Sequence, residues 1–461
     1  MSVAILAQDF WFVSPMGPPT APGFDVQHCV VQETEHFGPA AFANTPLSVG
    51  DIVLRESPFL RFESTHEGAD HAAQLCSRAA KQSGLAEVFT RPAAQVDWRS
   101  FGATQRSQIL EHFYAPDRSP SCQQHMEKCM QACTEMADGI PGIAPLWGAQ
   151  ELMQFLLKVD TNIHRDDESD IRRSGLFLVA AKFAHSCSPN CTWSFDPDFK
   201  LVYTVTRPVS GGEMLSFSYV GDGMNMLEGT HCRRCRLYAL GFVCACPRCC
   251  SSDLSRRMRC RSCGECSVLP VYEVAPRISP APQAGRPFQD ATQWRCSDCE
   301  ALFSSDEIPL TQEAELAHTA TSFFGTTQPV AGKVELYESC IEILGHNHWV
   351  SIVSIFLLLS RSLSELCRSD VVSFSDSTIA KWCKRMTRWF SEAMPESVQE
   401  MKAIVLCFEV GKQFGWESTP AFKRFAARVL PLARTFADAN GIVDVSQALR
   451  VKELEAIAES S

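Results

Sequence analysis

Residues 184–191 read Ala-His-Ser-Cys-Ser-Pro-Asn-Cys, and this stretch decides the fold because two further motifs follow it closely. The first is Gly-Glu-Met-Leu-Ser-Phe-Ser-Tyr at residues 212–219, and the second is Gly-Phe-Val-Cys-Ala-Cys-Pro-Arg-Cys at residues 241–249. A Cys-x-Cys-x-x-Cys run by itself is weak evidence of a site. Three motifs in this order are far more specific than any one of them.

This order of motifs resembles the signature of SET-domain protein lysine methyltransferases. The resemblance implies an α+β fold in which a split SET β-domain carries a helical insert. In that family the His-Ser-Cys segment threads under a loop and forms the site for S-adenosylmethionine. The Tyr that closes the Gly-Glu strand, here Tyr219, is implied to be the catalytic residue.

Composition limits the classes of function. The chain has 461 residues, 45% of them hydrophobic and 21% charged, which is typical of a globular protein with two to four domains. Its net charge of -11 argues against binding nucleic acid by phosphate neutralisation, and we interpret the local basic stretch 256–261 as a solvated face. The apolar run Trp349–Leu359 is too short to span a bilayer, so no membrane role is expected.

The cysteines are interpreted as reduced thiols and metal ligands. Residues 1–9 lack the basic start and the sustained apolar core of a signal peptide, so we expect a cytoplasmic or nuclear protein. In such a compartment the 22 cysteines do not form a disulfide framework. The scattered ones are expected to be small core hydrophobes, namely Cys340, Cys367, Cys383 and Cys407.

Sequence patterns divide the chain into six segments. Residues 29–62 alternate polar and apolar positions and predict short strands, whereas 67–150 and the chain past Pro309 have helical composition. Residues 46–54 and 208–215 repeat a turn with Gly and an acidic residue before a strand. The predicted segments are two SET halves at 1–65 and 151–228, a helical insert at 66–150, a post-SET zinc module at 229–252, a zinc ribbon-like module at 253–308 and a helical C-terminal domain at 309–461.

The insert and the helical tail extend the resemblance to the SMYD branch of the SET family. The C-terminal domain of that branch is tetratricopeptide-like, and Leu344–Trp349 resembles a helix start of that domain. The resemblance implies that this domain is a surface for protein partners. The SMYD insert holds a MYND zinc finger, whose opening Cys-x-x-Cys pairs are missing here. We interpret the stripe of Cys122, His125, Cys129 and Cys133 as a buried helix face, with a metal site as the alternative.

The resemblance also implies the residues that bind S-adenosylmethionine. The backbone of His185 is implied to hold the adenine ring and Phe242 to pack on it, while Asn162 ends the segment 155–162 that contacts the cofactor. The implied cofactor-binding residues are Gly38, Asn162, Ala184, His185 and Phe242.

Three positions depart from the family pattern. The usual Gly-x-Gly reads Gly38-Pro39-Ala40, the Asn expected before His185 is Ala184, and the Tyr expected before Phe242 is Leu240. Ala40 adds a Cβ where backbone approaches the ligand, Ala184 deletes a polar contact, and Leu240 removes a hydroxyl from the lysine channel. Two hypotheses follow: an active enzyme, or a catalytically impaired SET scaffold that binds protein partners.

Methyl transfer to a protein lysine requires a neutral amine, whereas free lysine has a pKa of about 10.4. A cationic sulfonium and a narrow apolar channel both disfavour the ammonium form. Alignment of the amine with the methyl group can then supply roughly 7 to 11 kcal/mol. The resemblance gives Tyr219 this alignment role.

Zinc prefers four tetrahedral ligands, and two thiolates separated by two residues reach one ion from a single turn. The resemblance implies one site, and the spacing of two Cys-x-x-Cys pairs predicts a ribbon-like second. Cys266 is an alternative ligand to Cys260, and Cys232 and Cys235 are assigned to a further site or to none. The two predicted sets are Cys187, Cys244, Cys246 and Cys249, and Cys260, Cys263, Cys296 and Cys299.

Overall fold

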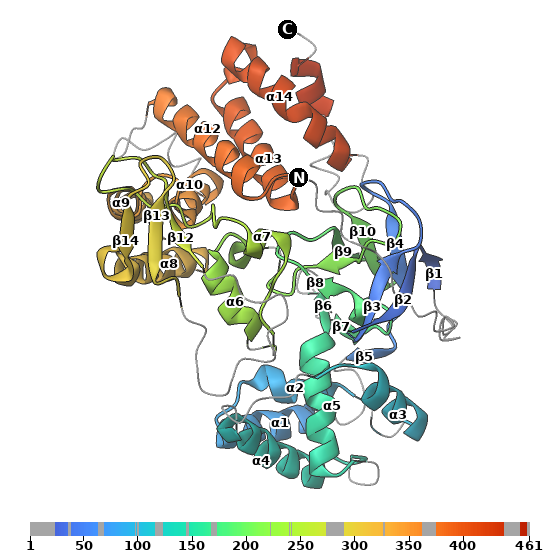
Figure 1. The fold of residues 1–461 in the computed structure, drawn as a ribbon. Coiled ribbons are helices and arrows are strands. Elements are labelled where there is room, and N and C mark those ends of the chain that lie inside the picture. The colour runs from blue at the N-terminus through green and yellow to red at the C-terminus, as the bar shows by residue number, and fades with distance from the viewer. Residues whose placement is uncertain are drawn as a thin grey trace.

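The computed structural model shows a β-rich centre with a bundle of helices projecting from one side and further helices on the other (Figure 1). It describes the chain apart from residues 1–23, 36–37, 63–68, 97, 99–100, 116–122, 144–146, 167–172, 222, 239, 241, 273–289, 326–327, 362–374, 438–451 and 459–461.

A four-stranded sheet joins the two predicted SET halves. Its order is β1 (Phe24–Gln27), β4 (Ile52–Glu56), β10 (Leu201–Val205) and β9 (Cys191–Phe195), all antiparallel. The repeated turns meet directly, because Leu47 and Val209 exchange backbone hydrogen bonds of 2.9 and 3.0 Å. In both turns an acidic side chain accepts the N–H three residues earlier, and Gly50 and Gly212 take positive φ. The strands predicted over 29–62 are therefore confirmed.

Three smaller sheets surround this one. Strand β2 (Cys29–Thr34) pairs with β3 (Gly38–Ala43), and β7 (Arg173–Leu176) lies between β5 (Leu60–Phe62) and β6 (His164–Asp166). Strand β8 (Ala184–His185) runs parallel to β11 (Ser216–Phe217). The 3-10 turn η2 (Ala180–Lys182) precedes β8.

The insert is helical, as predicted. Its helices are α1 (Ala69–Ser83), α2 (Glu87–Gln95), α3 (Ala103–His112) and α4 (Gln123–Gly139), and α5 (Ala149–Asn162) connects it to the sheets. Helix α5 forms because Leu152, Phe155, Leu156 and Val159 recur at helical spacing and are buried in one core.

The predicted buried face of α4 is confirmed for two of its cysteines. Cys129 and Cys133 are fully buried, and half-buried His125 places its Nε2 3.4 Å from the Cys129 Sγ. Cys122 lies outside the described residues.

A cysteine-rich region connects the SET sheets to the helical tail. It contains η3 (Met224–Met226), α6 (Thr230–Tyr238), α7 (Pro247–Cys250), the sheet of β12 (Val268–Val271), β13 (Gln293–Cys296) and β14 (Leu302–Ser304), and η4 (Ser305–Glu307). The interpretation of 256–261 as a solvated face is wrong for Arg256, which is 3% exposed. Acidic partners explain its burial, since Arg256 pairs with Asp290 and Glu313 at 2.6 Å each.

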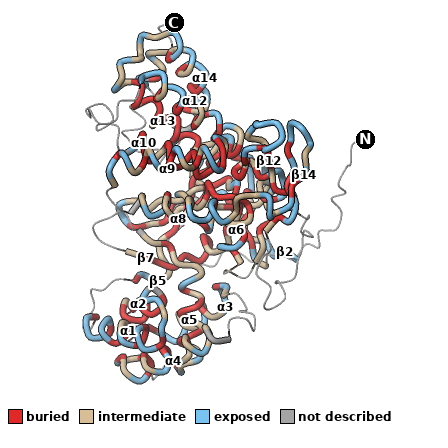
Figure 2. Tube along the Cα trace, turned by 90° about the vertical axis from the view of Figure 1, so that its left-hand side faces the viewer, coloured by how far each residue is buried: buried red, intermediate tan, exposed pale blue. Residues whose placement is uncertain are grey.

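The chain past Pro309 is helical, as predicted. It contains α8 (Leu310–Gly325), α9 (Val330–Ile343), α10 (Trp349–Arg361), α12 (Asp376–Ala393), α13 (Val398–Gln413), η5 (Trp416–Ser418) and α14 (Pro420–Ala437). Figure 2 shows buried residues concentrated where these helices meet. None of the described helices combines the length and the apolar content that crossing a membrane requires.

The scattered cysteines and two prolines of the helical tail can be located in the structure. Cys340, Cys383 and Cys407 are buried as expected, and Cys367 lies outside the described residues. Pro420 begins α14, and Pro431 lies inside that helix without ending it.

Candidate functional site

The segment between β8 and β9 is fixed by the buried amide of Asn190. Its Oδ1 accepts the Ser216 N–H at 2.7 Å, and its Nδ2 donates to the Met214 carbonyl at 2.9 Å. Nδ2 also lies 3.2 Å from Glu213 Oε1. Asn190 has no exposed surface, so breaking these bonds leaves buried polar groups unpaired. The two signature motifs are thereby held against each other.

Tyr219 follows β11 and is anchored at both ends. Its hydroxyl donates to the Phe183 carbonyl at 2.7 Å, and its backbone N–H donates to His185 Nδ1 at 2.9 Å. Burial raises the pKa of the phenol above its ordinary value, so the hydroxyl stays protonated at neutral pH. The residue is still 37% exposed, which leaves part of the ring open.

His185 connects Tyr219 to the cysteines. Burial lowers the pKa of His185 to about 4, so the ring is neutral. Because Nδ1 accepts the Tyr219 N–H, the ring proton is on Nε2, which lies 3.3 Å from the Cys187 Sγ. The ring centroid of Phe242 lies 5.9 Å from that of His185 and 6.2 Å from that of Tyr219. Three predicted site residues therefore form one aromatic cluster.

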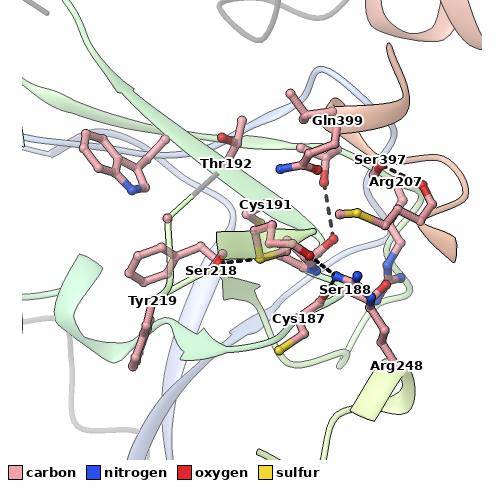
Figure 3. Close-up of a pocket in the computed structure, with 18 of the residues that line it drawn as sticks. Cys187, Ser188, Cys191, Thr192, Arg207, Ser218, Tyr219, Arg248, Ser397 and Gln399 are labelled. Carbon is pink, nitrogen blue, oxygen red and sulfur yellow. Dashed lines mark hydrogen bonds between the residues drawn. The ribbon is translucent and has the colours of Figure 1, made fainter. Parts of the chain in front are cut away.

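A cavity of about 1260 Å³ opens beside this cluster, as Figure 3 shows for some of its lining residues. Tyr219, Phe217 and Leu240 line one part of it, and the whole of β9 lines another. Residues 392–399, which include the end of α12, the connection to α13 and the start of α13, also line the cavity. Leu240, where the resemblance places a second hydroxyl, thus lines the same cavity as Tyr219.

The other predicted cofactor residues lie in different surroundings. Asn162 ends α5 and lines the cavity, but its Nδ2 donates to the carbonyls of Tyr114 and Lys158, each at 2.7 Å. Ala184 is half-buried in β8. Gly38 begins β3 with φ +63°, has open space where a Cβ would stand, and accepts a hydrogen bond from Thr34. The departure Ala40 is 2% exposed.

The first predicted cysteine set comes together. The four Sγ atoms of Cys187, Cys244, Cys246 and Cys249 lie within 4.8 Å of one another, with 3.6 and 4.0 Å for two pairs. Ligands about 2.3 Å from a tetrahedral zinc ion lie about 3.8 Å apart, so these positions fit zinc. The Cys187 N–H points at Cys246 Sγ over 3.4 Å, which supports a thiolate there.

The second set comes together in the same way. The pairs Cys260–Cys299 and Cys263–Cys296 each have sulfurs 3.7 Å apart, which again fits tetrahedral zinc. The alternative ligand Cys266 lies outside this set, and its sulfur accepts the His346 N–H at 3.3 Å. Among the described residues no third set forms, and Cys235 lies instead 3.6 Å from His231 on its own helix.

Sequence reasoning missed two buried groups beside the site. Glu56 of β4 is 2% exposed and accepts the N–H groups of Val179 and Ala180. His164 is 5% exposed, lines the cavity, and forms a 2.9 Å hydrogen bond with the Tyr203 hydroxyl. The only signal of Glu56 is an acidic residue that ends an apolar strand.

Comparison with known proteins supports the central part of this description. Residues 38–220 match the family model of the SET domain. A SET domain-containing protein of Acanthamoeba polyphaga mimivirus is 38% identical over 81 residues, which are 17% of this chain and 30% of that protein. The chain therefore contains a SET domain, and its match to the viral protein spans under a third of that protein's length.

Among solved structures, the SET domain of LSMT bound to lysine and AdoHcy covers 94% of this chain and 86% of its own. The identity is 10% and the TM-score is 0.30. A likeness at this level has no weight for the fold or the function of this chain.

Proposed function

We propose that the protein transfers a methyl group from S-adenosylmethionine to a lysine side chain of a protein substrate. The observation that carries this proposal is the double anchoring of Tyr219, by the Phe183 carbonyl and by His185, within a SET domain. S-adenosylmethionine, when bound, supplies an activated methyl group on a sulfonium.

The chain's own residues serve to orient the reactants. A hydroxyl whose proton is committed to a carbonyl presents its oxygen lone pairs to an incoming amine. Tyr219 is therefore suited to hold the amine at one angle at the cavity wall, beside apolar Phe217 and Leu240. An apolar wall disfavours the ammonium form and so favours the nucleophilic amine.

The aromatic cluster fits an adenosyl group only in part. His185 and Phe242 offer aromatic surface near Tyr219, and Gly38 leaves open space at its Cβ position. The Nδ2 group of Asn162, however, donates to two backbone carbonyls, so that Oδ1 is the amide atom that can contact a cofactor without breaking a hydrogen bond.

Two departures from the family pattern support a second candidate function, a catalytically impaired SET scaffold. Ala184 and Leu240 offer no polar atom where the resemblance implies Asn and Tyr. Such a scaffold would bind protein partners through its ribbon-like module and helical tail.

The finer features belong to the same proposal. They are the SMYD-like subtype, zinc in both cysteine sets, a tetratricopeptide-like tail that binds partners, and residence in the cytoplasm or nucleus. The boundaries of the six predicted segments stay predictions.

Calorimetric titration of zinc-loaded protein with S-adenosylmethionine separates the two functions. Heat of binding, and methylation of a mixture of lysine-centred peptides, are expected of the enzyme. Folded protein that binds no cofactor at millimolar concentration would contradict the enzyme and leave the scaffold.

Tyr219→Phe is expected to lower turnover on the order of 100-fold, because an aligning hydroxyl acts mainly in the transition state. Its affinity for S-adenosylmethionine in calorimetry should stay close to that of the parent. Tyr337→Phe, which removes a buried phenol from α9, is the matched control. Turnover of Tyr219→Phe equal to the control would show that Tyr219 is not catalytic.

A further inference from the structure

Glu56 connects two distant parts of the SET domain. It ends β4 and is 2% exposed. One carboxylate oxygen accepts the Val179 N–H and the other accepts the Ala180 N–H, each at 3.0 Å. These two residues lead into η2, more than 120 positions further along the chain. The carboxylate therefore fixes the start of that turn.

The turn η2 in turn presents the carbonyl that holds Tyr219. The Phe183 N–H donates to the Ala180 carbonyl at 3.1 Å, which closes the turn. The Phe183 carbonyl then accepts the Tyr219 hydroxyl at 2.7 Å. The next residue, Ala184, donates to Leu215 and begins the pairing of β8 with β11. A displacement of η2 thus moves the acceptor of the Tyr219 hydroxyl.

The observed geometry is that of the ionised carboxylate. Both oxygens accept an N–H, whereas a protonated carboxyl would turn an O–H donor toward one of these donors. Burial raises the pKa of Glu56 to about 7, and the N–H groups of residues 178–180 oppose this rise. Glu56 therefore changes its charge close to neutral pH.

Two titratable groups interact electrostatically with Glu56, namely Cys29 and Tyr203, and neither titrates near neutral pH. Burial raises the pKa of Cys29 on β2 to about 12 and holds that of Tyr203 on β10 well above its ordinary value. The ammonium of Lys182 on η2 is directed to the His112 carbonyl. A pH response of η2 can thus be assigned to the carboxyl group of Glu56.

We propose that Glu56 is a positioning residue for the methyl transfer proposed above, on which this inference rests. Its ionised carboxylate holds η2 so that the Phe183 carbonyl keeps the Tyr219 hydroxyl aligned. Proton uptake by Glu56 releases one N–H of the turn and lowers turnover.

The test compares the parent, Glu56→Gln and Glu228→Gln with lysine-centred peptides between about pH 6 and pH 9. Glu228→Gln is the matched control, because Glu228 is also buried and its carboxylate binds Arg236 on α6. In the parent, kcat should fall as pH drops through neutrality. Glu56→Gln should lower kcat by on the order of 10- to 100-fold and change the KM for S-adenosylmethionine little. It should also remove the part of the acid limb that belongs to Glu56, so that only the pH dependence of the substrate amine is left.

Two outcomes overturn the inference on different grounds. If Glu56→Gln keeps the kcat and the acid limb of the parent, Glu56 does not position Tyr219. If the folded, cofactor-binding parent methylates nothing at any pH, the proposed function fails and the positioning role fails with it.

Amide hydrogen exchange in the parent tests whether the ionisation of Glu56 holds the turn η2, and it needs neither a variant nor a substrate. Protection of the Val179 and Ala180 amides, corrected for the intrinsic pH dependence, should fall below neutral pH, while that of Ala184 falls less. Protection of all three that is independent of pH would overturn the proposal.

Discussion

At the residue scale, the site depends on side chains whose polar atoms are committed to backbone groups. Asn190, Glu56 and Tyr219 each bind main-chain atoms that lie between 24 and 124 positions away. A side chain that bonds to backbone constrains the path of the chain regardless of which residue supplies that backbone.

His164 should make stability depend on pH. Burial lowers its pKa from 6.5 to about 4, so the unfolded chain binds the proton more tightly. The stability that this group contributes is fully present above pH 6.5 and is lost as pH falls toward 4. At pH 5 the loss in the free energy of unfolding is about 2 kcal/mol. Urea unfolding at several pH values measures it, and His164→Gln should flatten the curve over this range. An equal effect of His71→Gln, which alters an exposed ring, would contradict the assignment.

At the element scale, several segments around the site are too short to be stable by themselves and depend on contacts with other parts of the chain. Helix α7 has four residues and β8 has two, too few to be stable alone. Arg248 of α7 donates to the carbonyls of Cys187 and Met226, and it thereby connects this helix to the signature segment. The first cysteine set is connected to Tyr219 through His185, whereas the second set includes Cys296 at the end of β13 in the small β12–β14 sheet.

Loss of the two cysteine sets should have different consequences. Structural zinc in small modules contributes an apparent ~10 to 16 kcal/mol at neutral pH. Cys246→Ser should remove one zinc ion and abolish S-adenosylmethionine binding, because the Cys187 backbone and His185 lie against this set. Cys296→Ser should remove the other ion and spare cofactor binding. Metal analysis and calorimetry check both, and fewer than two zinc ions in the parent would refute the assignment.

At the scale of the whole molecule, a buried ion network connects the cysteine-rich region to the helical tail. Arg256 pairs with Glu313 of α8, and Glu313 also accepts from His348, which has no exposed surface and directly precedes α10. The network is buried because the guanidinium has a carboxylate on each of two sides and lies 4.8 Å above the Trp294 ring.

Arg256→Met should destabilise the protein by about 3 to 5 kcal/mol, because Glu313 and Asp290 lose their charged partner while Glu313 stays buried. Denaturant unfolding measures the change. Arg388→Met is the control: this side chain is 76% exposed and pairs with Glu392 one helical turn away, a bond worth less than about 1 kcal/mol. Similar losses in the two variants would contradict the role of the buried network.

The sequence by itself determined the SET motifs, the helical insert and tail, and the membership of both cysteine sets. The helices and the Cys-x-x-Cys pairs depend on local spacing, since helical periodicity and these turns involve residues that are neighbours in the chain. The SET motifs and the place of Cys187 in the first set came from the family resemblance. The burial of Arg256 and the roles of Glu56 and His164 were decided only by tertiary structure. A lone charged residue in a sequence looks the same whether it faces solvent or a partner 57 or 123 positions away, and only folding brings that partner to it.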